Sequence, residues 1–235
     1  MTNLRIATLV ACSMLSLAAC GEADKVEQGS STGAASNTAE ATVEKPAGSL
    51  METGFGQSDI YVALIAIVQN TSDKVGQTVT VQFNIKDAND ELLASESQVE
   101  YFSGAGQKLL VQTQAELPKG KKAAKVDATL LVEDKGSFSS EPFPEIKTGP
   151  VKLVKSEYGE GFEAKVEVTN PKTEPLKSPR VGVVCYSTEK RIVGGGFTFP
   201  DLVPPSGKAV AEMDLLITGK PSSCVAYASP GAFED

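Results

Sequence analysis

Four cysteines are the side chains most able to do chemistry in this 235-residue chain, which contains no histidine and no tryptophan. The lack of histidine removes the commonest general base, the usual serine and cysteine triads and most zinc sites. No two cysteines stand in the Cys-x-x-Cys spacing that is typical of redox and metal centres. We therefore predict a chain without catalytic residues, metal ligands or a cofactor.

One serine and one lysine stand at the spacing of a known nucleophilic site. Ser187 and Lys190 match the Ser-x-x-Lys motif of penicillin-binding enzymes, and Lys147-Thr148-Gly149 matches their Lys-Thr-Gly motif. In those enzymes the serine motif opens a helix and precedes the other motif. Here it follows the other motif and lies on an expected hairpin turn. We interpret Ser187 as part of a polar turn and keep an envelope hydrolase only as a third hypothesis.

Two further short patterns fit structural roles better than ligand binding. Asp87, Asn89, Asp90 and Glu91 offer oxygen ligands, but one short turn supplies fewer than the roughly six to eight that calcium takes. We expect a solvated hairpin turn there. Gly194-Gly195-Gly196 has neither the Lys-Ser/Thr pair nor the following helix of a phosphate loop. We expect a bulge, a bend or a place where another backbone packs closely.

The N-terminal segment carries an export signature. An apolar run from Ile6 to Ala19 follows Arg5 and has the length of a signal-peptide core, which is too short to span a bilayer. The run ends in Leu17-Ala18-Ala19-Cys20, followed by glycine, and this stretch resembles the bacterial lipobox. The resemblance implies cleavage before Cys20, a lipid on Cys20, and anchoring to a membrane on the extracytoplasmic side of the cell envelope. The alternative is an ordinary secretory signal in which Cys20 is incidental.

Cys185 and Cys224 remain once Cys12 leaves with the leader and Cys20 is assigned to lipid. An even pair in an exported protein predicts a disulfide. We expect the bond to join two neighbouring strands of the C-terminal half. The alternative is a redox-active pair, but no group near either cysteine would lower a thiol pKa.

The charge of the chain restricts its partners. The formal net charge is −8, which disfavours nucleic acid because binding to phosphates depends on lysine and arginine. It also disfavours electrostatic attraction to anionic lipids, so the lipid on Cys20 must provide the membrane anchor. We expect no nucleic-acid partner, and either an envelope protein or a cell-wall polymer as the partner.

The elements that must position these residues are predicted to be strands. Thr78–Lys86, Val126–Val132 and Phe162–Thr169 alternate polar and apolar side chains, as strands do when one face lies in a core. Tyr61–Val68 is a continuous apolar run, which predicts a more fully buried strand. No segment has helical period and length, and strands separated by turn residues indicate a β-sandwich.

The two halves of the chain repeat one order of strands and turns. In each half a strand ends at an asparagine, Asn70 or Asn170, and a further strand, a polar turn and an apolar pair follow. Asn70 also begins a formal glycosylation sequon, but we expect an Asx-type turn there. The repeat aligns Cys185 and Cys224 roughly with Asn84 and Asp127.

This repeat predicts an all-β chain with two tandem immunoglobulin-like, or fibronectin-III-like, sandwiches. Residues 21–48 have almost no large apolar side chain and are expected to form a disordered tether. We expect two separable domains, with a single fused sandwich as the alternative. The predicted segments are a signal peptide at 1–19, the lipidated Cys20 and disordered linker at 20–49, β-sandwiches at 50–134 and 150–233, and an inter-domain linker at 135–149.

The order of strands and turns resembles the immunoglobulin-like modules of bacterial envelope lipoproteins, including the FxLYD-type domains. The match is closest from Val181 to Ala228, over Val184-Cys185-Tyr186, the stretch from Ile192 to Phe197, and Pro221-Ser222-Ser223-Cys224. The first half has neither the cysteine pair nor the triple glycine. The resemblance implies a non-enzymatic binding or scaffolding module, and the alternative hypothesis is an accessory protein that binds a small ligand or a cell-wall polymer.

Overall fold

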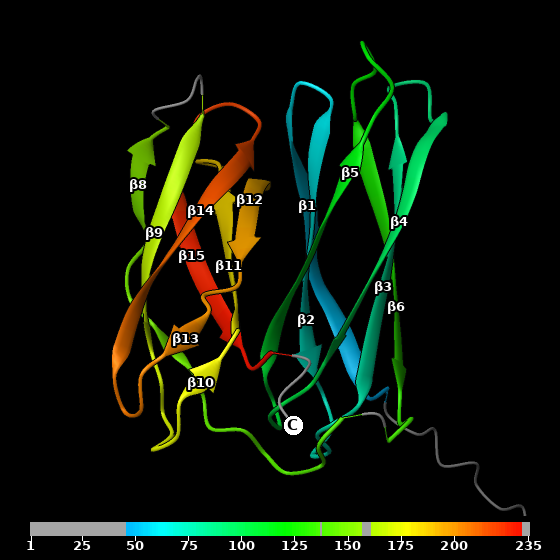
Figure 1. Cartoon of the computed structure of the whole chain (residues 1–235). Coiled ribbons are helices and arrows are strands. Elements are labelled where there is room, and N and C mark those ends of the chain that lie inside the picture. The colour runs from blue at the N-terminus through cyan, green and yellow to red at the C-terminus, as the bar shows by residue number, and fades with distance from the viewer. Residues whose placement is uncertain (1–45, 137, 157–160, 232–235) are drawn as a thin grey trace, which may run out of the picture. The chain divides into compact units, whose positions relative to one another are not determined.

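The computed structural model describes residues 46–136, 138–156 and 161–231, and every regular element in this part of the chain is a β-strand (Figure 1). The prediction of an all-β sandwich fold is confirmed. Within the same residues no helix has the length and apolar character needed to cross a bilayer. The signal peptide, Cys20 and the tether as far as residue 45 lie outside the described residues.

The first sandwich consists of two antiparallel three-stranded sheets. One sheet has the order β1-β2-β5, with bounds Gly48–Ser58, Tyr61–Asn70 and Lys108–Glu116. The other has the order β4-β3-β6, with bounds Leu92–Tyr101, Thr78–Lys86 and Lys125–Glu133. Alternate residues of the central strands β2 and β3 face each other across the core, among them Leu64, Val81 and Phe83. This arrangement explains the period-two pattern of β3.

The second sandwich repeats this arrangement with one difference. Strands β11 (Arg180–Tyr186), β12 (Ile192–Thr198) and β15 (Ser223–Ser229) form one layer, with β11 in the centre. The other layer contains β7 (Lys147–Thr148), β8 (Lys152–Lys155), β9 (Phe162–Thr169) and β14 (Lys208–Ile217), and a small separate sheet contains β10 (Leu176–Lys177) and β13 (Leu202–Val203). Because β12 also pairs with β14 at Gly194 and Gly195, the two layers are one continuous seven-stranded sheet.

A buried asparagine stands at the end of the equivalent strand in each sandwich: Asn70 is the last residue of β2, and Asn170 directly follows β9. Asn70 is 1% exposed, its side-chain amide donates to the carbonyls of Lys74 and Gly104, and its Oδ1 accepts a hydrogen bond from the Ser72 N–H. Asn170 makes the same kinds of bond, and its Oδ1 accepts from the Lys172 N–H. The expected Asx-type turn is therefore confirmed. The burial of Asn70 also leaves its amide inaccessible to glycosylation in the folded chain.

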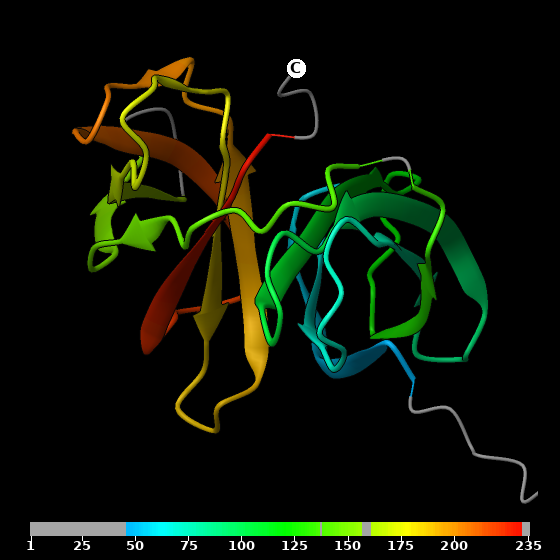
Figure 2. The same cartoon turned by 90° about the horizontal axis from the view of Figure 1, so that it is seen from below.

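The two sandwiches pack face to face. The face of the β1-β2-β5 sheet that is turned away from its own core meets the β11 layer, and Ile65, Ile67, Leu110 and Val184 form a third apolar cluster there. Figure 2 shows the two sandwiches viewed along their strands. Strand β2 is thus covered on both faces, which accounts for its continuous apolar run.

The described residues of both sandwiches belong to one compact unit. Whether either sandwich folds alone stays a prediction, because separation would expose the third apolar cluster to water. The ends of the predicted segments also differ from the strands. Strand β1 begins at Gly48, so the predicted linker at 20–49 was wrong at its C-terminal end. Pairing of Gly48 with Asn70 orders these residues, and composition does not reveal such pairing.

The predicted inter-domain linker is packed against both sandwiches in its described residues. Phe138 stacks on Tyr101 of the first sandwich, with ring centroids 4.4 Å apart. The Phe143 N–H donates to the Ser103 carbonyl, and Ile146 lies in the core of the second sandwich. Short strand β7 also lies within the predicted linker. The segment therefore follows the surface of the unit and adds contacts between its two halves.

Candidate functional site

The predicted disulfide is present between Cys185 and Cys224. The two residues lie directly opposite each other on the neighbouring antiparallel strands β11 and β15. Cys185 is fully buried in the core of the second sandwich, and Cys224 is partly buried against that core. The bond therefore fastens β15, which ends the sheet, to the central strand β11.

The alignment of the two cysteines with Asn84 and Asp127 was wrong by one residue. Both β3 and β11 carry a bulge at the same place, between Ile85 and Lys86 and between Cys185 and Tyr186. Ile85 is thus the equivalent of Cys185, and Val126 lies opposite Ile85. Because successive side chains of a strand point to opposite faces, a shift of one residue exchanges the core face for the outer face. The first sandwich therefore has an apolar pair where the second has its disulfide.

The equivalent hairpin turns use the polar side chains that had been considered for chemistry. The Ser187 hydroxyl accepts hydrogen bonds from the N–H groups of Glu189 and Arg191. The Asp87 carboxylate does the same for Asn89 and Glu91, and these bonds lower its pKa. Asp87 is an anchor of its turn, and Ser187 is part of a polar turn, as predicted.

A buried polar cluster that the sequence did not reveal lies between the two sandwiches. Arg180 Nε is 3.2 Å from Glu100 Oε1, and both side chains are less than one tenth exposed. The Arg180 guanidinium also donates to the Gln112 carbonyl and lies over the Phe197 ring, 4.1 Å from its centroid. Gln112 Nε2 in turn donates to the Val183 carbonyl, 3.0 Å away. These bonds connect β4 and β5 of the first sandwich with β11 of the second.

Burial dominates the electrostatics of the Glu100–Arg180 ion pair. It raises the pKa of Glu100, and the attraction of Arg180 only partly opposes this effect. It also lowers the pKa of Arg180. The ion pair is thus a specific contact between the sandwiches that costs desolvation on both sides. No local signal marks this pair, because Glu100 and Arg180 lie 80 positions apart in the sequence.

Glycines allow the backbones of the two sandwiches to approach closely. A Cβ at Gly56 would overlap the Leu216 carbonyl oxygen, and one at Gly54 would overlap the Ile192 side chain. A Cβ at Gly195 would meet the Gln112 amide of the first sandwich and the Val183 carbonyl of β11 in its own sandwich. The expectation that the triple glycine marks a close backbone approach is confirmed. The opposing glycines of β1 were missed, since a lone glycine in a strand has several causes.

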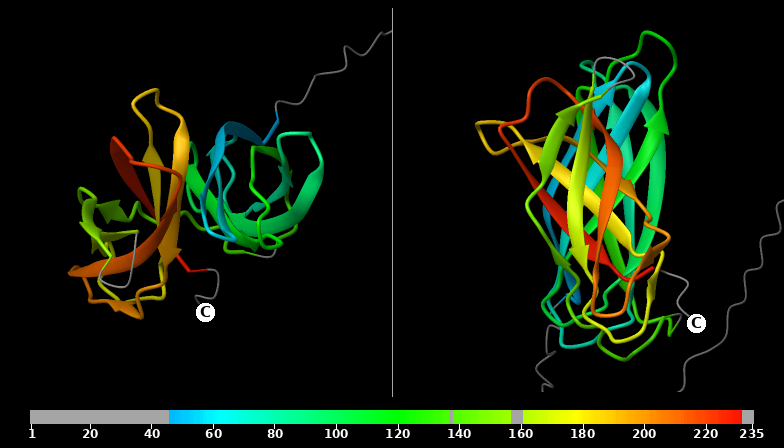
Figure 3. Two further views of the ribbon diagram at one scale, coloured as in Figure 1. Left: turned by 90° about the horizontal axis from the view of Figure 1, so that it is seen from above. Right: turned by 60° about the vertical axis from the view of Figure 1, so that its left-hand side comes forward.

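A groove of about 580 Å³ lies beside β1. We name it the edge groove, and its lining residues are Glu52–Phe55 of β1, Ala124 and Val126 at the start of β6, Lys190–Val193 of the β11–β12 hairpin and of β12, and Thr218. Figure 3 shows this hairpin extending beyond the body of its sheet, and strand β12, which follows it, contacts β1. The groove is thus formed by both sandwiches.

The charges of the edge groove nearly balance one another. Burial, and then the negative charge of Glu52, raise the pKa of the Tyr186 hydroxyl. Arg191 is paired with Glu189, and Lys190 adds one positive charge that opposes Glu52. Side chains of Val126, Ile192 and Val193 supply an apolar lining. The groove therefore suits an uncharged, partly apolar ligand better than an ion.

Two other surface depressions are less well defined by strands. One of about 900 Å³ is bounded by residues 103–108, by the segment 143–148 and by the end of β15. Another of about 440 Å³ lies beside Lys155 and Phe162.

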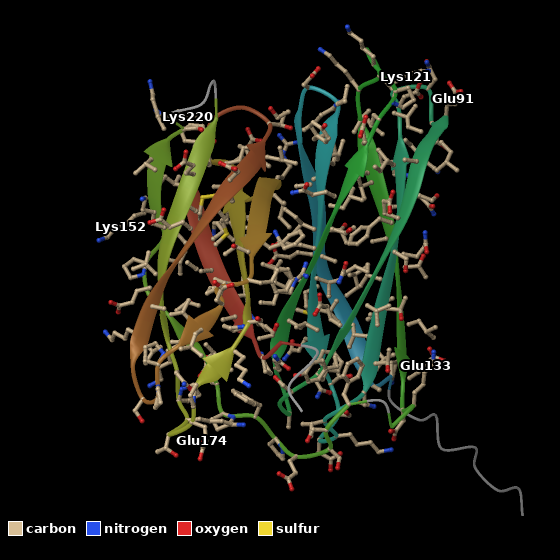
Figure 4. The ribbon with its side chains drawn as sticks, viewed as in Figure 1. Glu91, Lys121, Glu133, Lys152, Glu174 and Lys220 are labelled. Atoms are coloured by element: carbon tan, nitrogen blue, oxygen red, sulfur yellow. A yellow bond between two sulfur atoms is a disulfide. The ribbon has the colours of Figure 1, made fainter. Side chains whose placement is uncertain are left out.

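Figure 4 shows Lys121 and Glu91 at one end of the first sandwich, where their charged atoms are 3.7 Å apart. Such exposed pairs contribute little and define no site.

Comparison with known proteins finds similarity among solved structures. No family model matches it, and no curated protein matches it. Among solved structures, it is similar to the crystal structure of red sea bream transglutaminase, with 13% sequence identity and a TM-score of 0.26. The alignment covers 81% of this chain and 30% of the transglutaminase chain. The chain therefore spans less than a third of the length of that enzyme.

Proposed function

We propose that the chain is a lipid-anchored, non-enzymatic binding module of the bacterial cell envelope, which presents the edge groove to a partner. The observation that carries the proposal is the groove itself, since the walls from both sandwiches are fixed relative to each other by the buried cluster of Glu100, Gln112 and Arg180. A preformed site of this kind loses little freedom on binding. Cys20 would hold the module at a membrane through its lipid.

The polar turns support a binding role over a hydrolytic one. Ser187 accepts two backbone hydrogen bonds in its turn, and its neighbour Lys190 has a positive φ of 60° that the turn requires. Neither residue is arranged as a nucleophile with an adjacent base. The disulfide also fits an oxidising, extracytoplasmic compartment.

A photo-crosslinking experiment in the producing cells tests the binding role. A benzophenone amino acid replaces Thr53, which is exposed in the edge groove, and in a matched variant it replaces Val210, which is 59% exposed on β14. We expect a discrete adduct from position 53 that is absent from position 210. The same adducts from both positions, or none from position 53, would contradict a binding role for the groove.

The anchor is tested separately. Cells are labelled with an alkyne-bearing fatty acid, and the wild-type chain is compared with Cys20→Ser. We expect label and membrane retention only in the wild type, because the substitution removes the thiol that would carry the lipid. A mature wild-type chain that is soluble and unlabelled would contradict the lipoprotein assignment.

A further inference from the structure

We propose that the edge groove binds an extended, uncharged peptide segment, which adds as a strand to the open edge of β1. The inference rests on the proposed binding function and names the chemistry of the partner. Strand β1 ends its sheet, whose order is β1-β2-β5, and β6 ends the other sheet of the first sandwich. Both strands line the groove, so at least one unpaired strand edge is available to a peptide.

The phase of the β1–β2 hairpin shows which groups of β1 face the groove. Ser58 pairs with Tyr61 across a two-residue turn, so their backbone groups point toward each other. The groups of the preceding residue, Gln57, must then point away from β2. This is observed, because the Gln57 N–H donates to Thr218 Oγ1 at 2.9 Å. By the same alternation, the N–H and C=O of Phe55 and Thr53 point away from β2, toward the groove.

The walls of the groove suit an extended chain whose side chains alternate between two faces. On one side lie Ile192 and Val193 of the second sandwich, and on the other lie Ala124 and Val126 of the first. A peptide hydrogen-bonded to Thr53 and Phe55 would direct alternate side chains to these two apolar walls. The bulge between Leu50 and Glu52 interrupts the pairing of β1 and limits the usable edge to the residues after it.

The shape and charge of the groove favour a single peptide strand over a second copy of the chain. Gly54 lies in close contact with Ile192, so the wall formed by the β11–β12 hairpin lies against β1 and the edge of β1 is recessed. In a second copy of the chain the edge of β1 would be recessed in the same way, so the two edges could not reach each other. The groove has no net charge that would attract an acidic or basic segment, because Glu52 is opposed by Lys190 and Arg191 is paired with Glu189. An uncharged segment is therefore the best match.

The test uses the full lipid-anchored chain on vesicles and a fluorescent, capped peptide of alternating valine and threonine. A second peptide has the same side chains but carries N-methyl groups on alternate amides, which removes the hydrogen bonds to a strand edge. We expect the first peptide to bind and the methylated one to bind at least about tenfold more weakly, as measured by fluorescence anisotropy. No binding of the first peptide, or equal binding of both, would overturn the inference.

Two matched variants place the binding site. Ala124 is exposed in the groove, and Ala105 is also exposed, on the segment that bounds the 900 Å³ depression. We expect Ala124→Glu to weaken peptide binding at least about tenfold and Ala105→Glu to leave it unchanged. The reverse result would place binding in the other depression and overturn the inference. Thr53→Pro removes an edge donor without removing a hydrogen bond to β2 and should also weaken binding.

The outcomes separate this inference from the proposed function. If position 53 forms an adduct in cells while neither peptide binds, the groove has another kind of partner and only strand addition fails. An adduct that contains a cell-wall polymer would likewise refute strand addition and leave the proposed binding function standing. Concentration-dependent dimers that Ala124→Glu abolishes would make a second copy the occupant. If position 53 forms no adduct and the peptide does not bind, both proposals fail.

Discussion

Replacing Arg180 by methionine removes the cation that faces Glu100 between the two sandwiches. Glu100 is 7% exposed and would keep its hydrogen bond from Gln98 Nε2, at 2.9 Å. Burial already raises the pKa of this carboxyl with Arg180 in place, and the variant leaves that effect uncompensated. Removal of one partner of a buried ion pair costs about 3–5 kcal/mol. We expect Arg180→Met to lower the free energy of unfolding at pH 7 by this amount.

The opposite substitution should cost much less. In Glu100→Gln, Arg180 keeps its hydrogen bond to the Gln112 carbonyl and its position over the rings of Phe197 and Phe199. The neutral amide also avoids the desolvation of a carboxylate, so we expect a loss of about 1 kcal/mol or less. The double variant should resemble Glu100→Gln, so the coupling in a double-mutant cycle equals the cost of Arg180→Met alone, about 3–5 kcal/mol.

The pH dependence distinguishes a lost charge partner from lost packing. Without Arg180, the folded pKa of Glu100 is raised further above the ordinary value of 4.5. The folded state then binds the proton more tightly than the unfolded state, so the penalty is absent below the unfolded pKa and grows as the pH rises toward the folded pKa. Urea unfolding followed by circular dichroism at pH 7 and near pH 4 measures this. A cost of Arg180→Met below about 1 kcal/mol at pH 7, or one that is equal at both pH values, would refute the reasoning.

Three further perturbations test the fold. The Cys185–Cys224 bond closes a loop with a sequence separation of 39. Its reduction should lower the free energy of unfolding, measured with urea, by up to about 4 kcal/mol. A change below about 0.5 kcal/mol would contradict this prediction. Gly56→Ala should lower the free energy of unfolding by more than about 2 kcal/mol, because the new Cβ would overlap backbone atoms. Gly104→Ala, whose nearest contact would be 3.9 Å away, should change the melting temperature little. If both substitutions destabilise the chain to a similar extent, the close approach at Gly56 is contradicted. Asn70→Ala leaves two carbonyls without their shared donor and should cost about 2–3 kcal/mol by the same unfolding assay, and a neutral result would show that water replaces the amide.

Local periodicity was sufficient to place most strands. The segments predicted at Thr78–Lys86 and Phe162–Thr169 are β3 and β9 with the same bounds. Strict alternation and turn residues act over a few residues, and the chain repeats them in both halves. The Asx turn after Asn70 is likewise a local feature, made by hydrogen bonds to residues two to four positions away.

Periodicity was less able to predict which residues of the two halves are equivalent. The repeat located the disulfide strands but aligned Cys185 with Asn84, whereas the shared bulge makes Ile85 its equivalent. Spacing in the sequence counts residues, and the bulge changes how those residues pair across strands. Only the pairing decides which of two adjacent residues faces the core.

By itself, then, the amino-acid sequence determined the all-β class, the repeated order of strands and turns, and the pairing of the two available cysteines. Only the tertiary structure decided that the two sandwiches pack face to face, that Glu100 meets Arg180, and that β1, β6 and the β11–β12 hairpin form one groove. The physical reason is that alternation specifies which face of a strand avoids water, but not which surface covers that face. That choice depends on contacts between residues far apart in the chain, and on glycines such as Gly56 and Gly195 that make room for them.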